Sequence, residues 1–307
     1  MTQKKIGHRR LNRGYGVNFG SPAAPYLLMA PALIIIFVVL ILPIFYAIQL
    51  SCTDAQLLTI SHANWIGLKN YITFFSSPSL NKVLFATFIY VVLGVALTYL
   101  IGLGTASMLN TARKGNGLFR VILILPWVIP QVVLVLIWKW MLNPQYGVIN
   151  WFLTSLNLAP DPISWFTDVR FALIAILLVT IWKQYPLGCL ILLAGMKTIP
   201  VDLYEAAEID GASRWQRFCN ITLPGLRYVS SVLILLLVIW SFTNFVIIWM
   251  LTMGGPADRT ATLSIYTYLN AFKFNKLGYG AAIGVVCLMV SLIFSIVYYR
   301  KVISKND

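Results

Sequence analysis

The sequence predicts an all-α integral membrane protein with six transmembrane helices, and three observations support this fold class. Of 307 residues, 59% are hydrophobic and 10% are charged, and the mean hydropathy is +0.82, whereas about a quarter of a soluble domain is charged. Six apolar stretches reach the roughly 20 residues that a helix needs to cross a bilayer. No stretch shows the alternation of an outer-membrane β-strand, so helices must satisfy the backbone in lipid. The spans are expected at Tyr26–Leu50, Phe85–Leu109, Leu118–Leu142, Phe171–Gly195, Tyr228–Thr252 and Tyr279–Tyr299.

The distribution of basic residues predicts the side of the membrane on which each loop lies. If the N-terminus is cytoplasmic, the inside segments carry 15 lysines and arginines and the outside segments carry 6, as the positive-inside rule requires. The expected organisation is a basic cytoplasmic segment 1–25, a six-helix domain 26–300 with a cytoplasmic loop 196–227, and a cytoplasmic tail 301–307. The net charge of +14 follows from this topology. A nucleic-acid partner is not expected, because the basic residues are scattered over several loops.

The loop between the fourth and fifth spans is polar and charged, and its pattern predicts two short helices joined by a turn. Asp202 followed by Glu205 resembles an N-cap with an acidic third position, and Ser213 followed by Gln216 is a capping box. Gly211 lies between them, where a residue with positive φ lets the chain reverse. The first helix is acidic, whereas helices that lie on a membrane prefer basic polar faces. The pattern therefore favours docking to a protein, with contact to lipid headgroups as the alternative.

The residues of this loop resemble the signature of permease subunits in binding-protein-dependent ABC importers. The resemblance consists of an EAA triplet, an Asp-Gly pair and an Ile-x-Leu-Pro ending at gapless spacing, carried by Glu205, Ala206, Ala207, Asp210, Gly211, Ile221, Leu223 and Pro224. The stretches 65–71, 125–127, 146–150 and 251–256 are similar to the sugar-importing branch, which includes maltose, trehalose and glycerol-phosphate permeases. The resemblance covers roughly residues 22–302. It departs at Tyr228, close to where many members carry a proline, so the fifth helix is expected to start slightly differently.

The resemblance implies a type I ABC importer permease in the bacterial cytoplasmic (inner) membrane. The loop would then be the coupling helix that sits in a cleft of a cytoplasmic ATPase and drives alternating access. The implied partners are a second homologous permease subunit, two ATPase subunits, an extracytoplasmic sugar-binding protein, a carbohydrate substrate and the membrane lipid. The outside loops 64–79, 143–168 and 254–278 are candidate contacts for the binding protein. The chain itself would be non-catalytic and bind no cofactor, with ATP and Mg²⁺ at the partner ATPase, and its sequence has no G-x-x-x-x-G-K-[ST] phosphate loop.

Polar residues in the middle of predicted spans are candidates for the substrate pathway, because they are costly in lipid. Such residues occur in the fourth span and in the fifth, and the resemblance adds Leu187 near the sugar-lining positions of the maltose-type subunit. The alternative for Ser241 is a bond to its own helix backbone, and the alternative for Asn244 is a packing bridge between helices. Lys183 is expected either to serve neutral sugars or to pair with an anionic one. The predicted pathway residues are Lys183, Gln184, Leu187, Trp240, Ser241 and Asn244.

Two other classes of function compete with an importer subunit. A stand-alone secondary transporter of a small polar solute often buries acidic residues in its spans, but the nine acidic residues here lie outside the spans or at their edges. A membrane-embedded enzyme needs a converging acid, base or metal constellation. The two histidines lie in loops and the four cysteines show no metal-ligand spacing. Neither competing class is favoured, and the sequence does not identify the sugar.

Overall fold

The computed structural model describes residues 24–111 and 116–303, and it confirms an all-α membrane protein. Apart from one antiparallel bridge between Thr53 and Trp65, the regular structure of these residues is helical. Four helices are long and apolar enough to cross a membrane, or up to six if each of two bent pairs counts as one span. The predicted segments 1–25 and 301–307 fall largely outside the described residues.

The chain divides into two compact units, residues 1–47 and 48–307. In the first unit, α1 (Ala24–Ile36) continues through a π-helical turn, η1 (Phe37–Ile41), into α2 (Leu42–Ser51). Together they give a continuous apolar helix over Pro25–Ser51, close to the predicted first span. Pro31 lies within α1, which a membrane helix tolerates.

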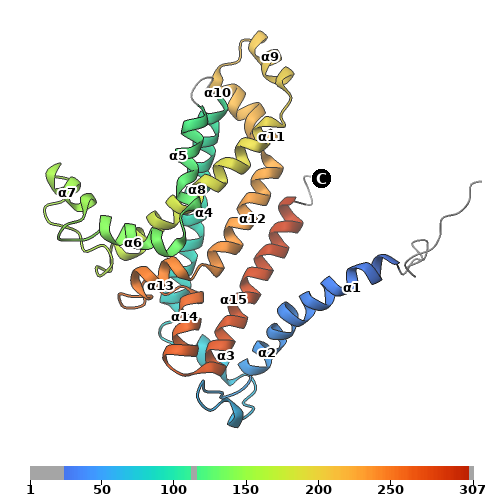
Figure 1. Cartoon of the computed structure of the whole chain (residues 1–307), viewed down its shortest axis with the longest axis vertical. Coiled ribbons are helices and arrows are strands. Elements are labelled where there is room, and N and C mark those ends of the chain that lie inside the picture. The colour runs from blue at the N-terminus through green and yellow to red at the C-terminus, as the bar shows by residue number, and fades with distance from the viewer. Residues whose placement is uncertain (1–23, 112–115, 304–307) are drawn as a thin grey trace, which may run out of the picture. The chain divides into compact units, whose positions relative to one another are not determined.

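Four long helices organise the second unit (Figure 1). The helix α4 (Leu80–Thr111) packs along α8 (Ala172–Lys197), and α12 (Arg227–Thr243) packs against both. The helix α15 (Leu277–Tyr298) packs against α12 and ends in a π-helical turn, η5 (Tyr299–Ile303). These four helices begin within about five residues of the predicted spans, an error typical of element boundaries.

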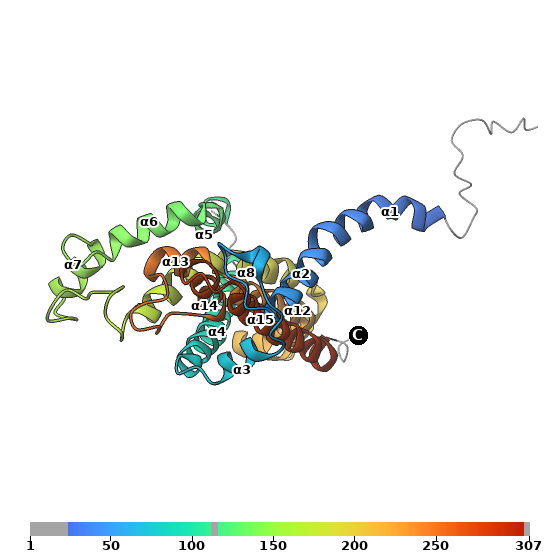
Figure 2. The same ribbon diagram turned by 90° about the horizontal axis from the view of Figure 1, so that it is seen from below.

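Two of the predicted spans are broken. The third consists of α5 (Asn116–Val128) and α6 (Gln131–Met141), which meet at an angle of 104°. The fifth ends its long helix α12 at Thr243 and resumes as α13 (Val246–Thr252). The sequence located both spans, 118–142 and 228–252, but did not indicate these breaks. Figures 1 and 2 both show α6 leading away from α4, α8 and α12.

Short elements complete the second unit. At one end lie η2 (Ile60–His62), α3 (Lys69–Phe75), α14 (Leu263–Tyr268) and η4 (Leu269–Lys273), with α3 packed against α15. The helix α7 (Val148–Ser155) follows α6. At the opposite end lie α9 (Val201–Ile209), α10 (Arg214–Arg217), η3 (Phe218–Thr222) and α11 (Leu223–Gly225), as Figure 1 shows. The loop 196–227 therefore lies at the opposite end of the second unit from α3 and α14.

Glycine permits a close crossing of α4 and α8. A Cβ atom on Gly102 would lie 3.1 Å from the backbone carbon of Gly188 and 3.1 Å from the backbone nitrogen of Cys189. Small residues allow this kind of backbone approach between membrane helices. Around the crossing is a buried apolar cluster that includes Leu192, Leu233 and Leu237. This cluster connects α8 and α12, the helices on either side of the loop 196–227.

Replacing Gly102 by valine is expected to destabilise the protein, because the facing atoms are backbone and cannot rotate away. Overpacking of this kind costs about 1–3 kcal/mol. The matched control is Gly104→Val on the same helix, since a Cβ there meets no atom within 4 Å. Thermal unfolding in detergent would test this prediction. Equal melting temperatures for the two variants would contradict it.

Candidate functional site

A central pocket lies where the two broken spans meet the middle of α8. Its volume is about 300 Å³, at the lower limit for small-molecule sites. Polar side chains and aromatic rings line it together. The lining residues are Trp127, Gln131, Lys183, Gln184, Leu187, Trp240, Thr243, Asn244, Phe245 and Val246.

Lys183 satisfies the backbone at the break in the third span. The helix α5 ends at Val128 and α6 begins after Pro130, so the last carbonyl groups before the turn lose helical partners. The Lys183 ammonium donates to the carbonyl oxygens of Trp127 and Ile129 at 2.5 and 2.6 Å. Because unpaired carbonyls are costly in lipid, this cation, which belongs to the neighbouring helix α8, stabilises the break. Two of its three N–H groups are thereby used within the protein.

Asn244 plays a comparable part at the break in the fifth span. Its backbone is extended between α12 and α13, and its side chain is buried. The Asn244 amide donates to the Tyr90 hydroxyl at 2.7 Å, and that oxygen lies 3.2 Å from the Thr180 hydroxyl. The Ser264 hydroxyl donates to the Asn244 carbonyl at 3.0 Å. These bonds tie the break to α4, α8 and α14.

The structure brings five of the six predicted pathway residues to the central pocket. Lys183, Gln184, Leu187, Trp240 and Asn244 all line it. Ser241 does not: its side chain is buried and donates to the Leu237 carbonyl oxygen at 2.8 Å. The alternative of a bond within its own helix therefore describes the Ser241 side chain. Asn244 both lines the pocket and bridges helices, so its two alternatives hold together.

Sequence reasoning did not assign Trp127, Gln131, Phe245 or Val246 to this pocket, whereas Thr243 was among the polar residues noted in the middle of the fifth span. Gln131 and Trp127 reach it only because the third span turns at Pro130. Proline in the run was the available signal, but Pro126 and Pro186 lie inside unbroken helices of the same protein. Proline alone therefore did not identify the break.

The loop 196–227 has the predicted form of two helices joined at Gly211. The capping box is confirmed: the Ser213 hydroxyl accepts from the Gln216 N–H at 3.3 Å, and the Gln216 side chain accepts from the Ser213 N–H at 2.7 Å. Gly211 has φ +77°, a conformation that favours glycine. The prediction of Asp202 as N-cap was wrong, because Pro200 occupies that position and Asp202 lies in the first turn without a capping bond.

Two contacts fold the helices of the loop onto each other. Arg217 and Glu208 form an ion pair at 2.7 Å, and the Tyr204 and Thr222 hydroxyls lie 3.0 Å apart. An exposed ion pair stabilises by only about 0.2–1 kcal/mol. The capping box and the glycine turn therefore contribute at least as much to the shape of the loop.

The outer face of the loop carries both charged and apolar exposed groups. Glu205, Ala206 and Asp210 are exposed, and the Ile209 side chain beside them is 87% exposed. Trp215 on the second helix is 71% exposed and stacks on Phe218 at a ring separation of 5.6 Å. Ala207, Ile221 and Leu223 are half-buried, whereas Gly211 and Pro224 are exposed. An exposed apolar patch with a polar rim marks an interaction surface.

Replacing Ser213 by alanine is expected to loosen the second loop helix without changing the rest of the fold. Loss of an N-cap hydroxyl costs about 0.5–2 kcal/mol. Hydrogen exchange should therefore increase for residues 214–222 while α4 and α8 stay protected. Ser291→Ala is a suitable control, because that hydroxyl donates an exposed hydrogen bond to the Leu288 carbonyl of its own helix, α15. Unchanged exchange in the Ser213 variant would contradict the role of the cap.

A set of apolar helices, two breaks around a polar pocket and a structured loop at one end define a membrane transport subunit. Residues 98–305 match the family described as binding-protein-dependent transport system inner membrane component. The chain belongs to this family.

The chain is similar to transport permeases over nearly their full length. The trehalose/maltose transport system permease protein of Thermococcus litoralis is 36% identical over 275 residues, covering 90% of this chain and 92% of that protein. The sulfoquinovosyl glycerol transport system permease protein of Agrobacterium fabrum is 33% identical over 306 residues, covering 99% of each. A subunit of a bacterial ABC transporter that imports the acidic polysaccharide alginate has the same fold, with TM-score 0.79 and 23% identity over 90% of this chain and 93% of that chain.

Proposed function

We propose that this chain is the permease subunit through which a bacterial ABC importer moves a carbohydrate across the cytoplasmic membrane. The observation that supports this most directly is the central pocket, where two breaks and the middle of α8 place amides and aromatic rings together. Discontinuous helices line substrate sites in other membrane transporters. The two relatives described above are sugar or sugar-derivative permeases by name.

The pocket offers chemistry suited to a polyhydroxylated substrate. Gln131 and Gln184 each carry a donor and an acceptor group for hydroxyls. Trp127 and Trp240 supply apolar faces with an N–H at one edge. The Lys183 ammonium is already engaged by two carbonyl oxygens, which favours a structural role for this cation over recognition of an anionic sugar.

Transport would be coupled to ATP through the loop 196–227. We define the coupling surface by two sets of residues in this loop. The exposed residues are Glu205, Ala206, Asp210, Gly211 and Pro224, and the half-buried residues that support them are Ala207, Ile221 and Leu223. This surface would dock on a separate cytoplasmic ATPase that binds ATP and Mg²⁺. Movement of the loop would reach the pocket through α8 and α12, which flank the loop and both contribute lining residues.

The assembly would comprise this chain, a second homologous permease, two ATPase subunits and an extracytoplasmic binding protein. A solved alginate transporter that shares the fold at TM-score 0.79 is in complex with a pentasaccharide-bound periplasmic protein. For this chain, the loops at the end opposite α9 are the corresponding candidates for that contact.

Reconstitution of the assembly that co-purifies with the tagged chain would test the proposal. Proteoliposomes containing ATP and supplied with the binding protein should accumulate a radiolabelled carbohydrate from a panel of neutral and anionic sugars. Uptake should stop when ATP is omitted. Transport by the purified chain alone without ATP would overturn the proposal and favour a secondary transporter.

A further inference from the structure

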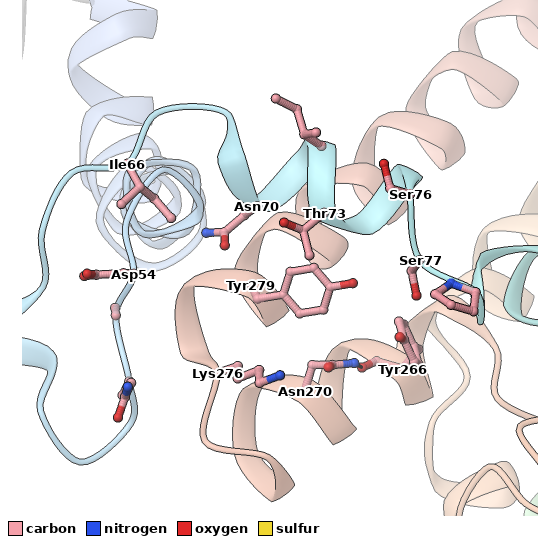
Figure 3. A pocket seen from close by; sticks show the side chains of 14 residues that line it. Asp54, Ile66, Asn70, Thr73, Ser76, Ser77, Tyr266, Asn270, Lys276 and Tyr279 are labelled. Atoms are coloured by element: carbon pink, nitrogen blue, oxygen red, sulfur yellow. Dashed lines mark hydrogen bonds between the residues drawn. The ribbon is translucent and has the colours of Figure 1, made fainter.

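A second cavity, of about 720 Å³, lies at the end of the second unit opposite α9. Figure 3 shows it between α3, the loop that follows α2, and the segment from α14 to the start of α15. It shares no lining residue with the central pocket. Ten of its fourteen lining residues carry a polar side-chain group, although more of the lining surface is apolar than polar, as in ordinary ligand pockets. We call it the outer cavity.

Hydrogen bonds hold the walls of the outer cavity in place. The buried Asn70 amide donates to the carbonyl oxygens of Ser51 and Thr53 at 2.9 and 2.8 Å. The Gly278 N–H donates to the Ala55 carbonyl at 2.9 Å, which ties the start of α15 to the loop after α2. A pre-formed cavity loses little conformational entropy when a ligand binds.

Several polar groups of the outer cavity have no protein partner. In the part of the chain that the structure describes, the side chains of Gln56, Ser76 and Lys276 make no hydrogen bond. The Asn70 and Asn270 amides donate to backbone carbonyls, but their side-chain oxygens accept no bond from these residues. The outer cavity thus keeps both donors and acceptors available to a ligand.

The charges around the outer cavity favour an uncharged ligand. Lys276 supplies one cation and Asp54 one carboxylate, and this carboxylate accepts from the Asn64 N–H at 2.6 Å. In Figure 3 the Tyr279 ring lies between Asn70 and Thr73 on one side and Lys276 and Asn270 on the other. An aromatic ring among amides, hydroxyls and a balanced pair of charges suits a neutral polyhydroxylated molecule better than an anion.

We infer that the outer cavity is a carbohydrate subsite that binds the transported sugar separately from the central pocket. The inference rests on the proposed function, because the sugar is the solute that the assembly presents at this face. Its location at the end opposite the coupling surface suits a site occupied before the sugar reaches the broken spans.

Counting sugar sites on the complete assembly tests this inference. The assembly in nanodiscs, without binding protein, is dialysed against the radiolabelled sugar that the proteoliposome assay identifies as imported. Thr73→Trp places an indole in the outer cavity and should remove one saturable site. Lys276→Met should weaken that site by about tenfold, the loss of one hydrogen bond from a charged donor. Leu68→Trp is the control, since it adds the same group to an exposed position just before α3 outside the cavity lining.

Each other result has a defined meaning. Equal numbers of sites in wild type and Thr73→Trp, with normal import, would overturn the outer subsite and leave the proposed function intact. Equal numbers of sites combined with loss of binding-protein-stimulated ATP hydrolysis in Thr73→Trp would also overturn the outer subsite. The outer cavity would then be a surface on which the binding protein docks. Failure of the wild-type assembly to import any sugar of the panel would overturn the proposed function and this inference together.

Discussion

Replacing Lys183 by methionine is expected to destabilise the chain and to reduce ATP-driven uptake by more than tenfold. Methionine keeps a long apolar side chain but removes the donor that bonds Trp127 and Ile129 at the break in the third span. Each carbonyl left unpaired in an apolar environment costs about 1–3 kcal/mol. Because the break forms a wall of the central pocket, this cost falls on the conformation that binds and moves the substrate. Even the lower value for both carbonyls exceeds the roughly 1.4 kcal/mol that corresponds to a tenfold change in the population of that conformation. Thermal unfolding and uptake by the reconstituted assembly would be measured in parallel.

Two further variants separate this explanation from a general effect of removing a membrane lysine. Lys139→Met removes a lysine near the end of α6, whose side chain makes no hydrogen bond within residues 24–111 and 116–303. It should therefore be tolerated. Lys183→Gln keeps two N–H donors and should recover part of the stability. If Lys183→Met unfolds like wild type and loses affinity only for anionic sugars, Lys183 is a substrate ligand and its role at the break is wrong.

The spans could be located from the sequence because their signal is local and strong. A run of about 20 apolar residues has few alternatives to a membrane helix, and α4, α8, α12 and α15 start within about five residues of the expected positions. The chain length and the positions of charged residues carry this signal without knowledge of tertiary contacts.

The breaks could not be located in the same way, because they depend on partners far away in the sequence. Pro126, Pro130 and Pro186 occur in similar apolar surroundings, yet only Pro130 lies at a break. There the freed carbonyls meet Lys183, more than fifty residues later. At Asn244 no proline is present, and the break is stabilised by Tyr90 and Ser264. These tertiary bonds also explain why four lining residues of the central pocket were missed.

The coupling loop lies between these two cases. Its capping box and glycine turn are local features, and both were predicted correctly from the sequence. Asp202 was predicted as the N-cap but lies two positions later, because Pro200 is the N-cap. Both acidic residues and proline are common around the first turn of a helix, so the sequence did not distinguish the two positions. The contact of Tyr204 with Thr222 joins the two helices and had no sequence pattern of its own.

Charge reversal at Glu205 is expected to uncouple the assembly while the chain stays folded. Glu205 is exposed on α9 and makes no ion pair within the described residues. Substitution of such a surface residue changes stability by less than about 0.5 kcal/mol. Reversing a charge that faces a partner places like charges together, which costs several kcal/mol. Glu205→Lys should therefore lose the co-purifying ATPase, whereas Asp202→Lys on the same helix, also exposed but outside the coupling surface, should keep it.

Gly211→Val tests the same surface through the backbone. At φ +77° a β-branched residue is strained by about 1–3 kcal/mol, and relief of the strain should reorient α9 relative to α10. Uptake is expected to fall at least as far as ATPase binding. Gly67→Val is the matched control for ATPase binding, because Gly67 also has positive φ, with no atom within 4 Å of a Cβ, but lies outside the loop. If Glu205→Lys and Gly211→Val keep a stoichiometric ATPase and wild-type uptake, coupling must pass through another surface of the chain. Loss of the ATPase in these two variants, but not in Asp202→Lys or Gly67→Val, would assign coupling to this loop, since each control carries a comparable charge reversal or backbone strain elsewhere.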